Sequence, residues 1–200
     1  FFLDVLKEFF KYDRIFVFVL IEFAFSSSNE NFDDEEKQLR TGIFRIVQHL
    51  LRQNMTKKDF ETILSTIGSS TDVIVHELLD LIYSLIDPPS SQTRAVALLL
   101  AQSNLLEQLY SLLIVHSLSN ETKILVLRII NSIIQSGHLS EQEQAQLRLE
   151  THHIGFGGII SGLSVKELNV VIVQEILQLI LSSSSPTAVH HLNTVLTLLS

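Results

Sequence analysis

Long apolar segments recur along the chain at nearly equal spacing. They cover residues 72–87, 122–135 and 169–182. Aligning Leu85 with Ile133 and Ile180 gives steps of 48 and 47 residues. A period of this length is typical of stacked helical repeats, in which a single unit cannot bury its apolar face alone. The pattern therefore predicts an all-α fold in which successive helices pack side by side.

Shorter stretches with apolar residues at helical spacing fill most of the remaining chain. We expect these helices at about residues 1–12, 14–25, 33–53, 56–67, 91–102, 105–116, 140–150, 156–163 and 187–199. With the three long segments they predict about ten to twelve helices. The polar, aperiodic stretch 26–34 is expected to be a flexible loop. No strand is predicted, because the β-prone run 170–173 follows a helix cap and belongs to a longer apolar segment.

Polar residues mark where several of these helices begin. Thr56 and Ser119 are expected to cap the helices that follow them, because a hydroxyl oxygen accepts from an exposed backbone amide. Ser140 and Ser164 are each followed three residues later by glutamate, which is the pattern of a capping box. The second of these boxes is expected to open the third long helix. Pro88 and its neighbouring proline end the first long helix.

Composition limits the classes of protein to consider. The chain has 200 residues, 46% of them hydrophobic, which is enough for one folded domain covering residues 1–200. Its net charge is −8 and we expect no basic stripe, so no nucleic-acid partner is predicted. Cysteine is absent, which excludes disulfides and thiolate metal sites and favours a cytoplasmic location. Because the chain starts without Met, inside an apolar helical pattern, we expect a fragment of a longer protein.

The phenylalanine-rich N-terminal region raises the question of a membrane. Residues 15–25 are strongly apolar, but Glu22 interrupts them and they are too few for a bilayer core, which needs about 20. A buried helix is the better interpretation. Acidic residues in the region outnumber Lys7, Lys11 and Arg14, so attraction to anionic lipid is expected to be weak. Membrane contact is therefore predicted to be peripheral at most.

Two segments carry a resemblance to a known family. Residues 157–163 (GGIISGL) lead into a polar turn and a long apolar helix, and residues 127–134 form the run LRIINSII. The first segment resembles the glycine-led short helix of the armadillo repeat. The second is similar to the inner-helix pattern of that family, Asn131 included. The resemblance covers about three units, between residues 55 and 185.

This resemblance implies an irregular armadillo/HEAT-like α-solenoid, with flanking repeats of the full-length chain at its ends. It departs from the regular pattern, since the glycine pair occurs once and the first step, from Leu50 to Leu85, is 35 residues. The irregular repeats, high leucine content and serine-rich loops also resemble regions of large BEACH-family scaffolds of the neurobeachin type. That likeness implies a scaffold in vesicle trafficking.

No catalytic motif is complete, so we do not expect an enzyme or a cofactor. His76 and Glu77 are similar to the start of a zinc-protease helix, but Asp80 stands where the second histidine is required. The adjacent histidines at 152–153 and 190–191 diverge around a helix and are poorly placed to chelate one ion. The glycines near Phe156 follow no strand and lack the spacing of a phosphate loop.

The pattern with most promise for function is a polar stripe that repeats from helix to helix. In the second long helix, Arg128, Asn131 and Gln135 share one face at spacings of three and seven. The two register steps and an alignment of Leu50 with Leu85 give the matching positions in the other helices. These are Arg45, Gln48 and Arg52; Asp80, Tyr83 and Asp87; and Glu175, Gln178 and Ser182.

In a solenoid such positions line one concave surface. We therefore expect a protein–protein interaction module that presents this surface to a peptide or helix, with Tyr83 and the arginines as the main anchors. Each helix would also show a polar face if it were only solvated. Two alternatives remain open: a structural spacer without a ligand of its own, and a membrane-peripheral module that uses the phenylalanine-rich N-terminal region.

Overall fold

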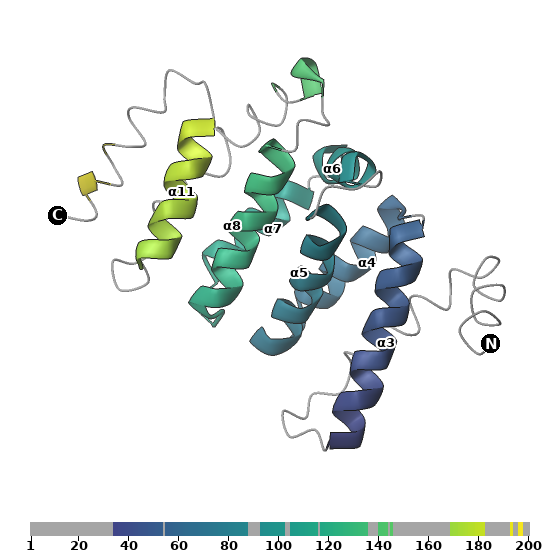
Figure 1. Ribbon diagram of the computed structural model, residues 1–200. Helices are drawn as coiled ribbons and strands as arrows, with labels where there is room; N and C mark the ends of the chain where they lie inside the picture. The colour runs from purple at the N-terminus through teal and green to yellow at the C-terminus, as the bar shows by residue number, and fades with distance from the viewer. Residues whose placement is uncertain are drawn as a thin grey trace. The chain divides into compact units, whose positions relative to one another are not determined.

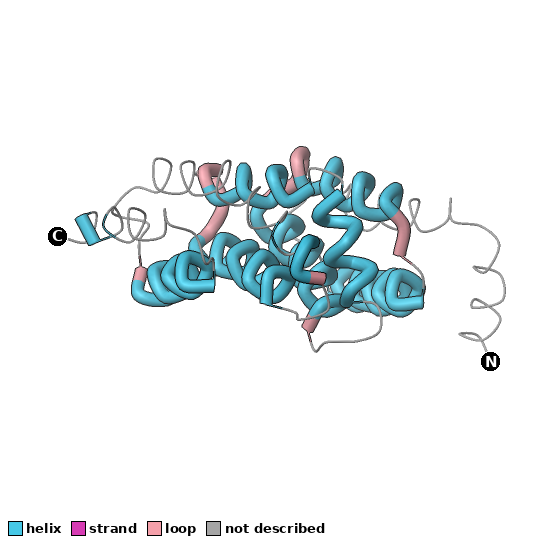
Figure 2. The backbone as a smooth tube through the Cα atoms, turned by 90° about the horizontal axis from the view of Figure 1, so that it is seen from above, coloured by secondary structure: helices cyan, strands magenta, loops and turns pink. Residues whose placement is uncertain are grey.

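The computed structural model shows helices joined by loops (Figure 1). It describes residues 34–53, 55–87, 93–102, 105–115, 117–135, 140–143, 145, 169–182, 193 and 196–197. Figure 2 shows helix and loop but no strand in these ranges, so the all-α prediction is confirmed for them. The helices predicted at 1–12, 14–25 and 156–163, and residues 26–33 of the predicted loop, lie outside the described residues. None of the described helices is long and apolar enough to cross a membrane.

The chain divides into two compact units, Phe1–Leu81 and Ile82–Ser200, and the division falls within helix α5 (Asp72–Ile86). The first unit contains α3 (Asp34–Gln53), α4 (Lys57–Ile67) and the first part of α5. α3 begins at Asp34, the last residue of the predicted loop 26–34, because that carboxylate and Glu35 favour a helix N-terminus. The expected helix at 33–53 is therefore confirmed from residue 34 onwards.

Apolar residues spaced about one turn apart form the core of the first unit. The buried side chains are Ile43, Val47 and Leu51 of α3; Met55; Phe60, Ile63, Leu64 and Ile67 of α4; and Ile74, Val75, Leu78, Leu79 and Leu81 of α5. Each leucine, isoleucine or phenylalanine removed from water in this way contributes about 1.5–3 kcal/mol. The apolar spacing read from the sequence therefore marks the sides of these helices that face the core.

Thr56 fixes the start of α4, as its sequence pattern predicts. Its hydroxyl oxygen accepts from the backbone amide of Asp59 at 3.4 Å, and its own amide donates to Asp59 Oδ2 at 2.7 Å. The hydroxyl also donates to the same carboxylate oxygen at 2.6 Å. This is a capping box with aspartate in place of glutamate, and Asp59 is buried by it.

The second unit contains the end of α5 and the helices α6 (Thr93–Gln102), α7 (Leu105–Leu113), α8 (Asn120–Gln135) and α11 (Val170–Ser182). α8 packs against both α7 and α11, and α6 packs against α7. Because α8 has neighbours on two sides, its buried apolar residues extend around much of the helix: Leu125, Val126, Leu127, Ile129, Ile130 and Ile133. On α11 the buried residues are Ile172, Ile176, Leu179 and Ile180. Figure 1 shows α8 in green and α11 in yellow-green lying side by side.

Caps at the N-termini of these helices confirm one prediction and correct another. Ser119 Oγ accepts from the backbone amide of Thr122 at 3.3 Å, so Ser119 caps α8 as expected. The third long helix, α11, begins at Val170, where Asn169 Oδ1 accepts from the amide of Ile172 at 2.8 Å. The expectation that Ser164 opens this helix is therefore wrong. Asparagine is among the best capping residues, and it stands closer to the apolar segment.

Candidate partner-binding surface

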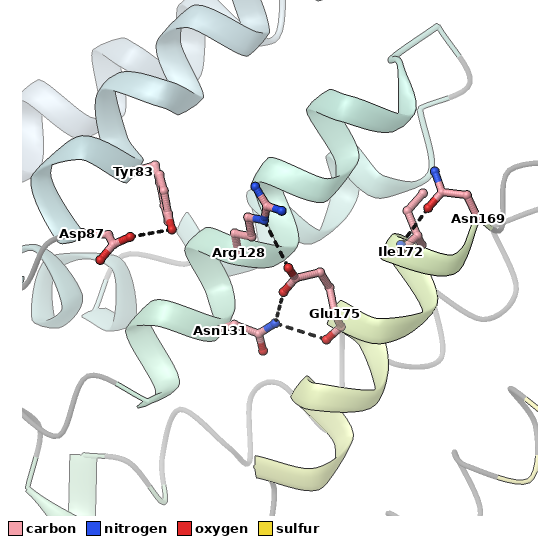
Figure 3. A network of polar contacts seen from close by, with 7 residues as sticks. All are labelled: Tyr83, Asp87, Arg128, Asn131, Asn169, Ile172 and Glu175. Carbon is pink, nitrogen blue, oxygen red and sulfur yellow. Dashed lines mark hydrogen bonds and ion pairs between the residues drawn. The ribbon is translucent and has the colours of Figure 1, made fainter.

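The contact between α8 and α11 brings two residues of the predicted polar stripe together. Arg128 Nε donates to Glu175 Oε1 at 3.1 Å (Figure 3). The two residues are 47 positions apart, the same step that the aligned apolar segments give. The Arg128 side chain is 49% exposed and that of Glu175 is 16% exposed. The Arg128 guanidinium is therefore oriented by a largely covered carboxylate, while about half of the Arg128 side chain faces solvent.

Asn131 also binds Glu175, from a buried position on α8. Its Nδ2 donates to Glu175 Oε2 at 2.9 Å and to the Glu175 backbone carbonyl at 3.1 Å. With 4% of its surface exposed, Asn131 lies in the α8–α11 interface, although the sequence pattern placed it on the solvated stripe. Its Oδ1 is buried and has no hydrogen-bond partner among the residues that the structure describes. The arrangement makes Asn131 a positioning residue, since both Glu175 carboxylate oxygens are held and Arg128 is oriented in turn.

Tyr83, near the end of α5, forms the second polar contact on this side of the unit. Its hydroxyl donates to Asp87 Oδ2 at 2.7 Å, across one helical turn (Figure 3). This hydrogen bond, together with partial burial and the negative charge of Asp87, raises the pKa of the Tyr83 hydroxyl. The charge of Arg128 lowers that pKa and the charge of Glu175 raises it. Tyr83 therefore lies within electrostatic reach of the Arg128–Glu175 pair.

The remaining stripe residues differ in exposure. On α3, Arg45 and Arg52 are exposed and Gln48 is half-buried, while Asp80 of α5 is exposed. Gln178 is exposed on α11, one turn beyond Glu175. The side chains of Gln135 and Ser182 lie outside the described residues. The structure thus brings together Arg128, Asn131 and Glu175, with Tyr83 nearby, and leaves the first unit's stripe residues to be considered within that unit.

An ion pair in the first unit was not predicted. Arg40 of α3 binds the Glu77 carboxylate of α5, and the Arg40 side chain is largely buried. The sequence analysis considered Glu77 only as part of a zinc-like motif. The available signal was weak: Arg40 is a cation on the buried side of an amphipathic helix, which requires a nearby anion. No group of three or more His, Asp or Glu in the described part of the chain could hold a metal ion.

Comparisons with known proteins give no further guide to the use of this surface. No family model matches the chain, and neither a curated protein nor a solved structure matches it.

Proposed function

We propose that the protein is a cytoplasmic protein-binding module, and that its long helices stack as an irregular armadillo/HEAT-like solenoid. In this proposal the aligned polar faces line a concave surface that holds a peptide or a helix of a partner protein. The side-by-side packing of α8 and α11 at a 47-residue step supports the stacking. The lack of cysteine supports the proposed location in the cytoplasm, which is a reducing compartment.

The single observation that carries the proposal is that Arg128 is paired with Glu175 and yet about half exposed. An arginine on a fully solvated surface samples many rotamers, and a partner must fix them at a cost in entropy. Here Glu175 already orients the guanidinium, and about half of the Arg128 side chain is exposed to solvent. A preorganised, partly exposed arginine beside a tyrosine is a typical energetic anchor in protein interfaces. Arg128 and Tyr83 are therefore the expected anchors, and Asn131 supports them from beneath.

A peptide-display selection against the whole chain tests this proposal. Selected peptides are titrated against the unaltered protein and the Arg128→Ala, Tyr83→Ala and Arg94→Ala variants. Arg94 provides the matched control, because it is an exposed arginine on α6, away from the stripe. We expect the first two variants to weaken binding by about 1–2 kcal/mol, roughly tenfold, with little change for Arg94→Ala. Unchanged affinity in both stripe variants would remove this surface from the account.

A structural spacer is the second candidate, and the buried position of Asn131 favours it. All three stripe residues brought together, Arg128, Asn131 and Glu175, form the α8–α11 contact itself, and under this alternative the polar repeat fixes helix register. In that case the stripe variants would lower stability, and no selected peptide would bind saturably. The BEACH-family likeness, with its role in vesicle trafficking, and a peripheral membrane role for the N-terminal phenylalanines are further proposals. Vesicle flotation of the whole chain tests the latter.

A further inference from the structure

Residues 37–58 form a basic segment between the acidic residues at 33–36 and Asp59. Residues 37–58 contain six of the 14 Lys and Arg residues and no Asp or Glu: Lys37, Arg40, Arg45, Arg52, Lys57 and Lys58. The other residues carry the remaining eight cations and all 22 acidic residues, a net charge of −14. The expectation that no basic stripe interrupts the acidity is therefore wrong for this segment. Arg40 pairs with Glu77 and Lys57 pairs with Glu61, so Arg45 and Arg52 carry the positive charge on the exposed side of α3 that would attract an acidic partner.

The structure gathers part of this charge on one face of α3. Arg45, His49 and Arg52 follow one another at spacings of four and three, and all are exposed. The opposite face carries the buried residues Ile43 and Val47. Arg40 does not belong to this exposed face, because its side chain is largely buried and binds Glu77. The exposed face, which we term the α3 outer face, comprises Gln38, Leu39, Gly42, Arg45, His49 and Arg52.

Gly42 is the second sign that something approaches this face. A glycine inside a helix costs about 1 kcal/mol relative to alanine, so its presence requires a reason. Packing among the described residues gives none, because a Cβ at Gly42 would meet none of their atoms within 4 Å. One turn earlier, Leu39 is 57% exposed. A small residue beside an exposed leucine leaves room for the backbone of a partner and an apolar contact for it.

From this combination we propose that the α3 outer face binds an acidic amphipathic helix of a partner protein. The partner's carboxylates pair with Arg45 and Arg52, and its apolar side chains cover Leu39 above Gly42. The face from Gln38 to Arg52 is about 21 Å long at 1.5 Å per residue, the length of about four helical turns. Nucleic acid fits less well, because the face has no Phe, Tyr or Trp for stacking and the rest of the chain, with a net charge of −14, repels polyphosphate. The inference rests on the proposed function only in treating α3 as part of a protein-binding surface.

Fluorescence anisotropy on the whole chain tests this inference with a defined probe. The probe is a labelled helical peptide of about 16 residues of Glu, Ala and Leu, with the glutamates along one stripe. We expect the double variant Arg45→Gln, Arg52→Gln to weaken its binding about tenfold, and Arg94→Gln to leave it within about twofold. Gly42→Leu, which fills open space and preserves the charge, is expected to weaken binding about fivefold or more. Circular dichroism checks that each variant keeps its helix content.

Several results would overturn the inference. These are no saturable binding of the acidic peptide, equal binding of the same peptide with lysine in place of glutamate, or equal losses in Arg94→Gln and the α3 variants. A single-stranded oligonucleotide that binds as tightly, with the same dependence on Arg45 and Arg52, would assign the face to polyphosphate instead. Arg128→Ala separates this test from the proposed function. If it weakens the display-selected peptides while the α3 variants bind the acidic probe normally, only the present inference fails.

Discussion

Arg128 Nε lies 3.1 Å from Glu175 Oε1, and the two residues are separated along the chain by the same 47 positions that separate Ile133 from Ile180. The apolar residues of α8 and α11 bury corresponding faces, so polar residues at the same phase meet at the edge of the contact. The pair therefore links the sequence register to the geometry of the surface.

Asn131→Asp tests whether the buried amide holds the two helices together. The substitution keeps the shape of the side chain but turns the Nδ2 donor into a carboxylate oxygen that faces Glu175. We expect a loss of about 2–4 kcal/mol in the free energy of unfolding at neutral pH, measured by urea denaturation. Gln108→Glu adds the same charge at an exposed position on α7 and is expected to cost less than about 0.5 kcal/mol. Equal effects of the two variants would contradict the positioning role.

A double-mutant cycle on Arg128 and Glu175 measures the strength of their pair. Because Arg128 is about half exposed, solvent screens the interaction, and we expect a coupling energy of about 0.2–1 kcal/mol. Raising the salt concentration should reduce this coupling, since the Debye length shortens. Urea denaturation of Arg128→Ala, Glu175→Ala and the double variant provides the measurement. A coupling near zero at low salt would show that the pair does not orient Arg128.

Tyr83 is expected to titrate above the ordinary range for tyrosine. Its hydrogen bond to Asp87 favours the protonated hydroxyl, so its folded pKa is raised above the unfolded value near 10.0. The stability that this provides is fully present below the unfolded pKa and is lost as the pH rises through the folded pKa. Asp87→Asn should lower the pKa of Tyr83, as followed by the ultraviolet absorbance of tyrosinate, with Tyr83→Phe identifying the signal. An unchanged titration in Asp87→Asn would contradict the assigned cause.

Thr56→Ala should remove the capping box of α4. The substitution leaves the backbone amide of Asp59, in the first turn of the helix, without its hydroxyl acceptor. It also removes a donor from the buried Asp59 carboxylate. We expect a loss of about 1–2 kcal/mol in the free energy of unfolding. Ser69→Ala is the control, because its exposed hydroxyl donates to the Thr66 carbonyl in the last turn of α4, far from the capping box. Thermal unfolding of the two variants compares them directly, and equal midpoints would count against the cap.

The sequence allowed the helices and one register step to be predicted because both depend on apolar spacing. Residues such as Ile133 and Ile180 fix the phase of each helix around its axis, and the phase then places Arg128 opposite Glu175. The apolar spacing could not predict whether a polar residue at the edge of the helix contact is buried. Asn131 is only one turn from Arg128, and whether a polar residue there faces solvent or a neighbouring helix depends on how closely the helices pack.

Two other features show where local patterns are ambiguous. Ser164 and Asn169 both precede the same apolar segment and both can cap a helix, so the pattern alone did not identify Asn169 as the cap. The Arg40–Glu77 pair joins residues 37 positions apart, whereas the aligned leucines of the same two helices are 35 apart. Long, flexible side chains reach neighbours that a register of apolar positions does not specify. The net charge of the whole chain likewise concealed the basic segment at 37–58.

Photo-crosslinking from Gln178 examines whether a peptide lies on the proposed binding surface, because this residue is exposed one turn from Glu175 on α11. A photoreactive amino acid is placed at position 178 or at the exposed control position 108 on α7, and each protein is irradiated with a peptide selected against the whole chain. The account predicts a crosslink from position 178 that free peptide competes away and Arg128→Ala diminishes. Crosslinks of equal yield from both positions, or from position 108 alone, would contradict it.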